Sequence, residues 1–117
     1  MKNSHLFSEF KIKDTKFRNR VVMSPMCQYK SNNGLINDWH FQHYSRFAFS
    51  GLGGAFVEAT GVSPDGRITH GCTGLWADNQ IEGLRKITNV FRNYQCVSGI
   101  QLAHSGRKGS FLRPWDG

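Results

Sequence analysis

The segment Val21-Val22-Met23-Ser24-Pro25-Met26-Cys27-Gln28-Tyr29 decides the fold prediction for this chain. It opens with an apolar, β-branched run that is typical of a buried strand. Pro25 ends that strand, because proline has no N–H for a ladder bond and also restricts Ser24 before it to extended geometry. A hydroxyl, a thioether, a thiol, an amide and a phenol follow at once. Since ligands collect at the carboxyl ends of parallel strands, the segment favours the wall of an α/β active site over a strand that leads into an ordinary mixed loop.

Two amphipathic segments alternate with two further apolar runs. The first helix is predicted to begin at Asn37 or Asp38, either of which can cap it, and its buried face is expected at His40, Tyr44, Phe47 and Ala48. Gly51-Leu52-Gly53-Gly54 ends this helix as a C-cap and tight return, and the second strand follows at 55–60. These glycines do not form a phosphate loop, because such a loop lies between a strand and a helix N-terminus.

A long loop, 61–76, leads to the second helix. Asp78 or Asn79 is expected to cap it, the latter with Glu82 as its partner in a capping box, and the inner stripe is expected at Ile81, Leu84, Thr88 and Phe91. The third strand is predicted at 96–102. At the start of the chain, the segment 6–20 predicts a hairpin with Asp14-Thr15 as its turn.

The order of these elements, a hairpin and then β-α-β-α-β, predicts an α/β fold with a parallel sheet and right-handed crossovers. The strands start about 35 and then about 40 residues apart, a spacing that suits a (β/α)₈ barrel of eight units and roughly 250 residues. The 117 residues supply the hairpin and about three of these units. Such a piece leaves open sheet edges and one uncovered face. We therefore expect residues 1–117 to form a single partial domain, the N-terminal part of an incomplete TIM barrel.

The net charge of +7 permits an anionic partner such as nucleic acid. The basic residues are scattered, however, and the densest stretch, 11–20, alternates with Ile12 and Phe17 as the wet face of a hairpin does. We therefore expect no nucleic-acid partner. No run reaches the roughly 18 apolar residues of a membrane span, and residues 1–6 lack the apolar core of a signal peptide. A cytoplasmic protein with no membrane partner is the expectation.

The cysteines and histidines do not form a recognisable metal site. The three cysteines, Cys27, Cys72 and Cys96, are odd in number and lack CxxC spacing, which argues against a disulfide framework and an ordinary zinc site. His40 and His43 are spaced i, i+3 as a metal pair can be. With no matching carboxylate motif, helix packing or capping is the favoured interpretation, and we expect no metal.

Five motifs, in matching order and spacing, make this chain similar to the old yellow enzyme family. They are Asn19-Arg20-Val21-Val22-Met23-Ser24-Pro25-Met26-Cys27-Gln28-Tyr29, Val57-Glu58-Ala59-Thr60, Gly66-Arg67-Ile68, Gly74-Leu75-Trp76 and Gly99-Ile100-Gln101-Leu102-Ala103-His104-Ser105-Gly106-Arg107-Lys108. The likeness covers nearly the whole chain and is closest to the NADPH dehydrogenase or xenobiotic reductase branch, the small thermostable-type ene-reductases. It implies a (β/α)₈ barrel about three times this length, whose N-terminal hairpin, here 1–20, closes the barrel bottom.

The resemblance also implies a cofactor, FMN, held at the C-terminal mouth of the barrel. NADPH or NADH delivers a hydride to the flavin, which passes one to the β-carbon of an activated alkene such as an enone. By this resemblance the cofactor-binding residues are Ser24, Pro25, Met26, Cys27, Ala59 and Gln101. Ala59 allows close approach of the ring, and the Gln101 amide, with donors and an acceptor, bonds its pyrimidine side.

Cys27 and Tyr29 are the residues expected to act in the reaction. The polarizable thiol of Cys27 is expected to tune the flavin potential, and the neutral phenol of Tyr29 is expected to hold the substrate carbonyl oxygen. Without the resemblance, Cys27 fits a small buried hydrophobe and Tyr29 an amphipathic rim residue. His104 and Arg107 lie just beyond the third strand, and Arg107 suits either a cofactor contact or a structural ion pair.

The resemblance assigns the rest of the site to later strands. The residue pair that binds the substrate carbonyl and the loops that bind the flavin phosphate are expected in a C-terminal barrel half beyond this sequence. We therefore expect an N-terminal portion of an FMN-dependent ene-reductase that is inactive without that half and that forms homo-oligomers as part of the complete protein. The alternative is a non-catalytic barrel fragment or an interaction module.

Overall fold

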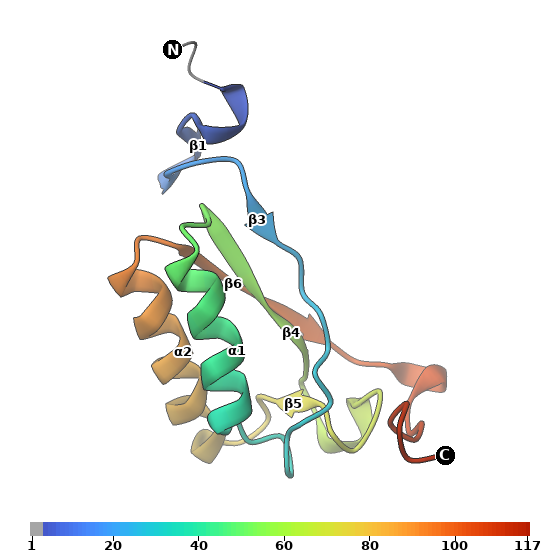
Figure 1. Cartoon of the computed structure of the whole chain (residues 1–117). Coiled ribbons are helices and arrows are strands. Elements are labelled where there is room, and N and C mark those ends of the chain that lie inside the picture. Colours follow the sequence, from blue (N-terminus) through green and yellow to red (C-terminus); the bar gives the residue numbers. More distant parts are fainter. Residues whose placement is uncertain (1–3) are drawn as a thin grey trace.

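The computed structural model describes residues 4–117; residues 1–3, which belong to the predicted hairpin segment 1–20, lie outside the described residues. Two helices cover one face of a parallel sheet (Figure 1), namely α1 (Asp38–Phe49) and α2 (Ile81–Asn93). The sheet contains the strands β3 (Val22–Met23), β4 (Gly54–Gly61), β5 (Thr73–Gly74) and β6 (Val97–Ala103). None of the described helices is long and apolar enough to cross a lipid bilayer.

The central strand of the sheet is β4. It pairs in parallel with β6 from Gly54 to Gly61, while β3 pairs with the start of β4 and β5 with its end. Since β6 occupies one edge of β4, β3 and β5 share the other edge. The outer edges of β3 and β6 form no strand pairs within residues 4–117, so the sheet does not close there. The predicted parallel α/β architecture is confirmed, whereas β5 lies in a segment that we expected to be loop.

The predicted hairpin forms from β1 (Phe10–Ile12) and β2 (Thr15–Phe17), but its turn lies one residue earlier than expected. Ile12 pairs with Thr15, so Lys13 and Asp14 make the turn and the Asp14-Thr15 prediction is wrong. Lys13 takes up the left-handed backbone, with φ 52°, that such a two-residue turn requires. The hairpin covers the amino ends of the strands, where a Cβ on Gly54 would lie 2.9 Å from the Phe17 ring.

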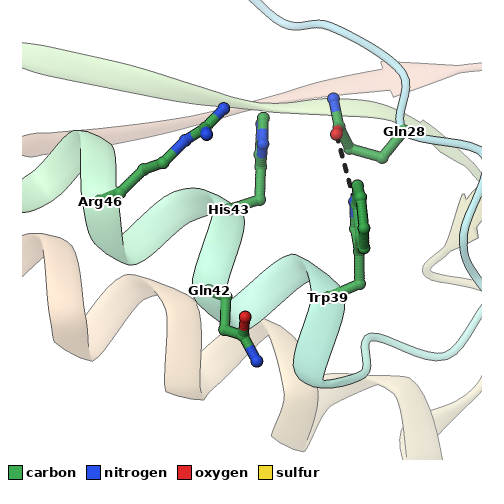
Figure 2. Close-up of a pocket in the computed structure, with 5 residues that line it drawn as sticks. All are labelled: Gln28, Trp39, Gln42, His43 and Arg46. Carbon is green, nitrogen blue, oxygen red and sulfur yellow. Dashed lines mark hydrogen bonds between the residues drawn. The ribbon is translucent and has the colours of Figure 1, made fainter.

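Helix α1 begins and ends as predicted. Its N-cap is Asn37, whose side-chain oxygen accepts the Trp39 N–H at 3.1 Å. The Nδ1 atom of His40 lies 3.2 Å from the Asn37 backbone nitrogen and completes the cap. Gly51, at φ 84°, ends the helix in the left-handed conformation that glycine favours. The Trp39 indole also donates to the Gln28 side-chain oxygen at 3.2 Å, which ties the helix to the segment after β3 (Figure 2).

Helix α2 differs from the prediction at its start. It follows a short 3₁₀ turn, Asp78–Gln80, and no side chain caps it. The prediction that Asp78 or Asn79 caps this helix is therefore wrong. Glu82 does not complete a capping box but forms an ion pair with Arg85 at 2.9 Å. The side-chain oxygen of Gln80 accepts the backbone N–H groups of Trp76 at 2.8 Å and Ala77 at 3.0 Å, so this amide fixes the backbone that leads into the turn.

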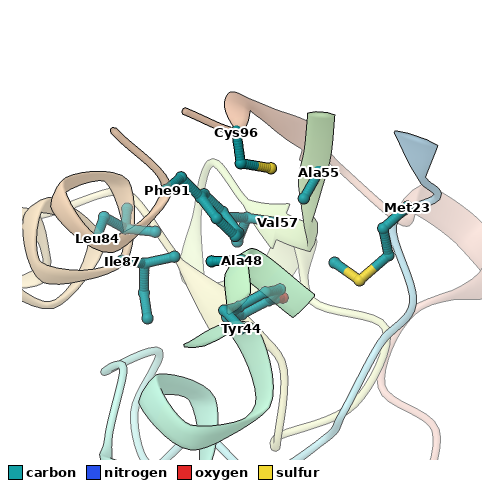
Figure 3. Close-up of a cluster of buried hydrophobic side chains, with 9 residues drawn as sticks. All are labelled: Met23, Tyr44, Ala48, Ala55, Val57, Leu84, Ile87, Phe91 and Cys96. Atoms are coloured by element: carbon teal, nitrogen blue, oxygen red, sulfur yellow. The ribbon is translucent and has the colours of Figure 1, made fainter. Parts of the chain in front are cut away.

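The hydrophobic core lies between the two helices and the sheet (Figure 3). Its buried side chains come from β3, α1, β4, α2 and the residue before β6, namely Met23, Tyr44, Ala48, Ala55, Val57, Leu84, Ile87, Phe91 and Cys96. Ile87 takes the place expected for Thr88, and Ile81 is exposed, because the sheet-facing stripe of α2 is Leu84, Ile87 and Phe91. On the opposite face of the sheet Phe56 is 40% and Leu102 59% exposed, so that face is uncovered, as predicted.

Candidate functional site

The predicted site residues lie at the carboxyl ends of three neighbouring strands. Ser24 and Pro25 follow β3 directly, Ala59 lies near the end of β4, and Gln101 lies on β6. Because β4 separates β3 from β6, these residues spread across one end of the sheet in that order. The position agrees with the general rule that parallel sheets bind ligands at this end.

An open groove of about 510 Å³ on the uncovered face brings three of these residues together. Its polar lining comes from Ser24 and Gln101, and the remaining walls are apolar, from Val22, Pro25, Phe56, Ile100 and Leu102. The Gln101 amide is exposed and forms no hydrogen bond with another group among residues 4–117. The groove therefore offers a flat apolar wall with one free amide.

A β-bulge at Glu58 decides which residue of β4 lies opposite Gln101. Val57 pairs with Ile100 and Ala59 pairs with Gln101, so Glu58 has no partner on β6. Its side chain turns toward α1 instead, where the Tyr44 hydroxyl donates to it at 3.2 Å. The buried Ala59 thereby comes directly opposite Gln101. A strict alternation along 55–60 would have placed Glu58 beside the groove and Ala59 in the helix layer.

Cys27 lies beside a second thiol that the sequence analysis did not select. Its S–H bonds to the sulfur of Cys72, and this bond, with burial, raises the pKa of the Cys27 thiol. The same bond lowers the pKa of Cys72, and the backbone N–H of Thr69, at 3.4 Å, adds to that effect. Cys27 is half-buried and Cys72 is buried. Because Cys27 and Cys72 are far apart in the sequence and lack CxxC spacing, the sequence did not indicate that they lie side by side.

Tyr29 and Met26 lie outside the groove. Tyr29 has a left-handed backbone, with φ 53°, and its ring lies 6.4 Å from that of Trp115. Burial, followed by the nearby Cys27 and Cys72, raises the pKa of its phenol. Met26 is 48% exposed, and its backbone carbonyl accepts a hydrogen bond from the Gln28 amide at 2.9 Å. The predicted residues thus form two groups, one in the groove and one around Cys27, with Ala59 between them.

The buried carboxyl of Glu58 is the main feature that sequence reasoning missed. One oxygen accepts the Gln28 N–H at 2.8 Å, and the other lies 3.2 Å from the Tyr44 hydroxyl and 3.7 Å from His40 Nε2. Burial raises the pKa of Glu58 to about 7 and lowers that of His40 to about 4, so the two are both neutral between these values and form no ion pair. A lone charged residue inside the apolar run 55–60 was the available signal.

A separate pocket of about 400 Å³ lies on the helix side of the molecule (Figure 2). Its lining comes from α1 and from the segment after β3, namely Gln28, Trp39, Gln42, His43 and Arg46. None of the predicted site residues belongs to it. His43 packs edge-on against the rings of Tyr44 and Phe47, at 4.9 and 5.1 Å, while His40 helps to cap the helix, so helix packing and capping explain this pair as predicted. Among residues 4–117 no three potential metal ligands gather.

The loop after β6 contributes His104 and Arg107 at the same end of the sheet. His104 Nδ1 accepts the Gly106 N–H at 3.0 Å, which shapes the turn. Arg107 is exposed and takes part in none of the ion pairs found among the described residues.

The opposite pKa shifts of Glu58 and His40 predict a specific pH dependence of stability. Folding raises the pKa of Glu58 from 4.5 to about 7, so this group stabilises the folded chain at low pH and that contribution is lost as the pH rises. Folding lowers the pKa of His40 from 6.5 to about 4, so its contribution is lost as the pH falls. Between 4.5 and 6.5 we expect the two effects nearly to cancel.

The cancellation is tested with two single variants in urea titrations at several pH values. In His40→Gln the free energy of unfolding should fall by about 3 kcal/mol as the pH rises from 4.5 to 7, because the Glu58 contribution is then unopposed. In Glu58→Gln the free energy of unfolding should rise with pH over the same range. Equal pH slopes in the two variants would contradict the assignment.

Replacing Cys72 should change the reactivity of Cys27. Cys72→Ala removes the acceptor of the Cys27 S–H, so the pKa of Cys27 should fall toward its ordinary value and alkylation by iodoacetamide at neutral pH should accelerate several-fold. Peptide mass spectrometry measures the rate at Cys27. Cys96→Ala is the control, because Cys96 lies in the core cluster and does not contact Cys27. An unchanged rate in Cys72→Ala would argue against the thiol pair.

Residues 5–112 match the sequence model of the NADH:flavin oxidoreductase / NADH oxidase family. The NADPH dehydrogenase of Listeria monocytogenes serotype 4b (strain CLIP80459) is 47% identical over 107 residues, which are 90% of this chain and 32% of that protein. The NADPH dehydrogenase of Listeria welshimeri is 46% identical over the same shares of the two chains, 90% and 32%. The chain therefore spans about a third of the length of the curated relatives it matches.

Solved structures agree with the fold. Morphinone reductase in complex with tetrahydroNAD superposes with a TM-score of 0.82 at 25% identity, over 92% of this chain and 29% of that one. The old yellow enzyme homologue of Zymomonas mobilis gives 0.80 at 26% identity, over 89% and 29%. The Old Yellow Enzyme of Pichia sp. AKU4542 gives 0.82 at 24% identity, over 90% and 28%, which bears on the fold alone.

These neighbours are TIM-barrel enzymes, so the described strands and helices form a partial α/β piece of such a barrel. The resemblance to old yellow enzymes that the motifs suggested is confirmed. The family implies FMN as cofactor and a nicotinamide as hydride donor. The chain belongs to the NADH:flavin oxidoreductase / NADH oxidase family of oxidoreductases.

Proposed function

We propose that this chain supplies one wall of the FMN site of an NAD(P)H-dependent ene-reductase, which reduces activated C=C bonds of α,β-unsaturated carbonyls. The observation that carries the proposal is the groove in which Ser24, Pro25 and Gln101 meet beside the Ala59–Gln101 pair. The similarity to an NADPH dehydrogenase and to morphinone reductase supports a nicotinamide-dependent reduction.

The groove fits the ring of the proposed cofactor. A flavin ring has flat apolar faces and a polar pyrimidine edge, and the groove supplies apolar walls with a free amide at Gln101. Ala59, directly opposite Gln101 on the neighbouring strand, has only a methyl side chain at this position. The phosphate of FMN would be held elsewhere, because barrels of this kind bind phosphate on the loops after the last strands.

Each predicted residue has a distinct role in this proposal. When bound, FMN would supply the hydride-transfer chemistry. Gln101 would orient the ring through its amide, while Ser24 and Pro25 would line one side of it, with Met26 next to them in the chain. Cys27 would tune the flavin potential through a thiol that its bond to Cys72 keeps protonated.

Tyr29 would hold the carbonyl oxygen of the substrate. That role requires a protonated phenol, and burial raises the pKa of Tyr29, which keeps the donor in place at neutral pH. A hydrogen bond to this oxygen polarises the C=C bond toward hydride addition at the β-carbon.

The unpaired edges of β3 and β6 also favour a second candidate, a non-catalytic module that docks on a partner's sheet. The exposed Phe56 and Leu102 on the uncovered face suit such contacts. In the ene-reductase proposal the same edges and face receive the remaining strands of the barrel and the cofactor. The complete barrel of that proposal would form homo-oligomers in the cytoplasm.

The two candidates are distinguished by completing the barrel. Residues 1–117 are joined to the part of the Listeria monocytogenes NADPH dehydrogenase that follows the matched region, and the hybrid is purified with excess FMN. We expect a yellow protein that oxidises NADPH with a cyclic enone as acceptor. In the hybrid, Gln101→Leu should weaken FMN binding about tenfold, the loss of one or two hydrogen bonds.

The matched control is Ser98→Ala, which removes an exposed hydroxyl from the same strand without touching the groove. Fluorescence titration of FMN gives the dissociation constants. A folded hybrid that binds no FMN, or an affinity that is equal in Gln101→Leu and Ser98→Ala, would refute the proposed wall and favour the docking module.

The tuning role of Cys27 is tested in the same hybrid. Cys27→Ala removes the polarizable sulfur and should shift the midpoint potential of the bound flavin, measured by equilibration with a reference dye. Cys96→Ala, in the helix-side core, should leave the potential unchanged. A potential that does not move in Cys27→Ala would eliminate the tuning role but not the binding wall.

A further inference from the structure

The bulge in β4 turns the carboxyl of Glu58 under the segment that carries Cys27 and Tyr29. The Glu58 side chain is 0% exposed, and its Oε2 atom accepts the backbone N–H of Gln28 at 2.8 Å. Gln28 stands between Cys27 and Tyr29 in the chain. A hydrogen bond from the centre of the sheet therefore helps to hold the middle of the segment after β3, together with the Trp39 indole on the Gln28 side chain.

Tyr29 needs this support because its backbone is in an unfavourable region. Its φ of 53° is left-handed, which side chains other than glycine, asparagine and aspartate rarely adopt. Such a residue persists only where its neighbours determine its conformation. The neighbouring backbone bonds are Gln28 N–H to Glu58 on one side and Ser31 N–H to the Gly71 carbonyl, at 2.9 Å, on the other.

The other end of Glu58 is fixed by helix α1. The Tyr44 hydroxyl donates to Glu58 Oε1 at 3.2 Å and accepts the Glu58 backbone N–H at 2.9 Å. Tyr44 is 1% exposed and belongs to the core cluster, so it cannot move independently of the helices. A rigid connection thus runs from the core through Tyr44 and Glu58 to Gln28.

Burial of the Glu58 carboxyl costs free energy, so its position calls for a structural or functional reason. A buried carboxyl without a cationic partner is strongly disfavoured relative to an apolar side chain of the same size. The one basic side chain beside Glu58 among residues 4–117 is His40, which burial keeps neutral above about pH 4. Packing alone does not explain Glu58, whereas the bond to Gln28 does.

We propose that Glu58 is a positioning residue, which holds the Met26–Tyr29 segment in the conformation that the FMN wall and the substrate-binding phenol require. This inference rests on the proposed function. Glu58 touches neither the groove nor the reacting groups, and it acts through the Gln28 backbone.

The bond to Gln28 should depend on pH. The groups that face Glu58 are His40 and Tyr44 from α1, Cys72 from the segment before β5, and Cys27 and Tyr29 from the segment after β3. An ionised carboxylate accepts an N–H more strongly than a neutral carboxyl does. Because burial raises the pKa of Glu58 to about 7, the segment should be held more firmly above that pH than below it.

Amide hydrogen exchange at Gln28, measured by NMR on the 117-residue chain, tests the bond without any flavin. In the wild-type chain the protection factor of the Gln28 amide, corrected for intrinsic exchange, should rise as the pH passes through about 7. Glu58→Gln retains an acceptor oxygen, so most of the protection should remain while the pH step disappears. Glu58→Ala should reduce the protection at least tenfold.

Two comparisons separate a local effect from general unfolding. Thr60→Val removes two buried hydrogen bonds of the same strand, to the Glu58 carbonyl at 2.8 Å and with the Thr73 hydroxyl at 3.1 Å, without touching the carboxyl, and should leave Gln28 protected. The Val97 amide, bonded to the Gly53 carbonyl at 3.0 Å, should keep its protection in Glu58→Ala. A Gln28 amide that is unprotected in the wild type, or unchanged in Glu58→Ala, overturns the proposal.

The hybrid barrel then tests whether the bond serves the site. FMN affinity should fall several-fold in Glu58→Ala, recover largely in Glu58→Gln and remain unchanged in Thr60→Val. If Gln28 exchange depends on Glu58 while FMN affinity does not, the positioning role is wrong although the bond exists. If the wild-type hybrid binds no FMN, the proposed function fails independently of the exchange result.

Discussion

The bond between the Glu58 carboxyl and the Gln28 backbone is the constraint on which the arrangement of the candidate site depends. It exists because the bulge in β4 removes Glu58 from the alternation of the strand and gives its place opposite Gln101 to Ala59. The same irregularity therefore does two things at once. It sets Ala59 rather than Glu58 opposite Gln101 on β6, and it anchors the segment after β3 through the Glu58 carboxyl.

The two faces of the sheet have different roles as a result. The face toward α1 and α2 is packed with apolar side chains and is complete within the described residues. The opposite face carries the groove, the exposed Phe56 and the free Gln101 amide. The packed face thus stabilises the fold, while in the proposed function the opposite face would bind the ligand, with Glu58 connecting the two.

The sequence was sufficient to predict those elements of the fold whose residue patterns are periodic. Alternating apolar runs and amphipathic segments predicted the three main strands, both helices and the parallel sheet, and the Asn37 cap was among the two predicted. Of the cofactor residues that the resemblance implied, Ser24, Pro25 and Gln101 line the groove, whereas Met26, Cys27 and Ala59 do not. In each case the signal is local, because periodicity, capping and turn residues act within a few positions.

The parts that were missed depend on contacts between distant residues. The bulge at Glu58 is a matter of register between β4 and β6, and no pattern within 55–60 reveals it. The pairing of Cys27 with Cys72 likewise requires the fold, since the two residues come from different loops. The predicted cap of α2 was wrong because a 3₁₀ turn, Asp78–Gln80, precedes the helix, and the Gln80 side chain accepts the backbone N–H groups of Trp76 and Ala77 before that turn.

The one-sided core also bears on how such a barrel assembles during synthesis. Its side chains come from β3, α1, β4, α2 and Cys96, elements that are adjacent in the chain, so the contacts can form as soon as this segment has left the ribosome. The helix-covered side would then be a preformed platform, onto which later strands add at the open edge of β6. In that order of events the uncovered face, which we propose contacts the flavin, would be the last to be enclosed, and the cofactor would have free access until the barrel closes.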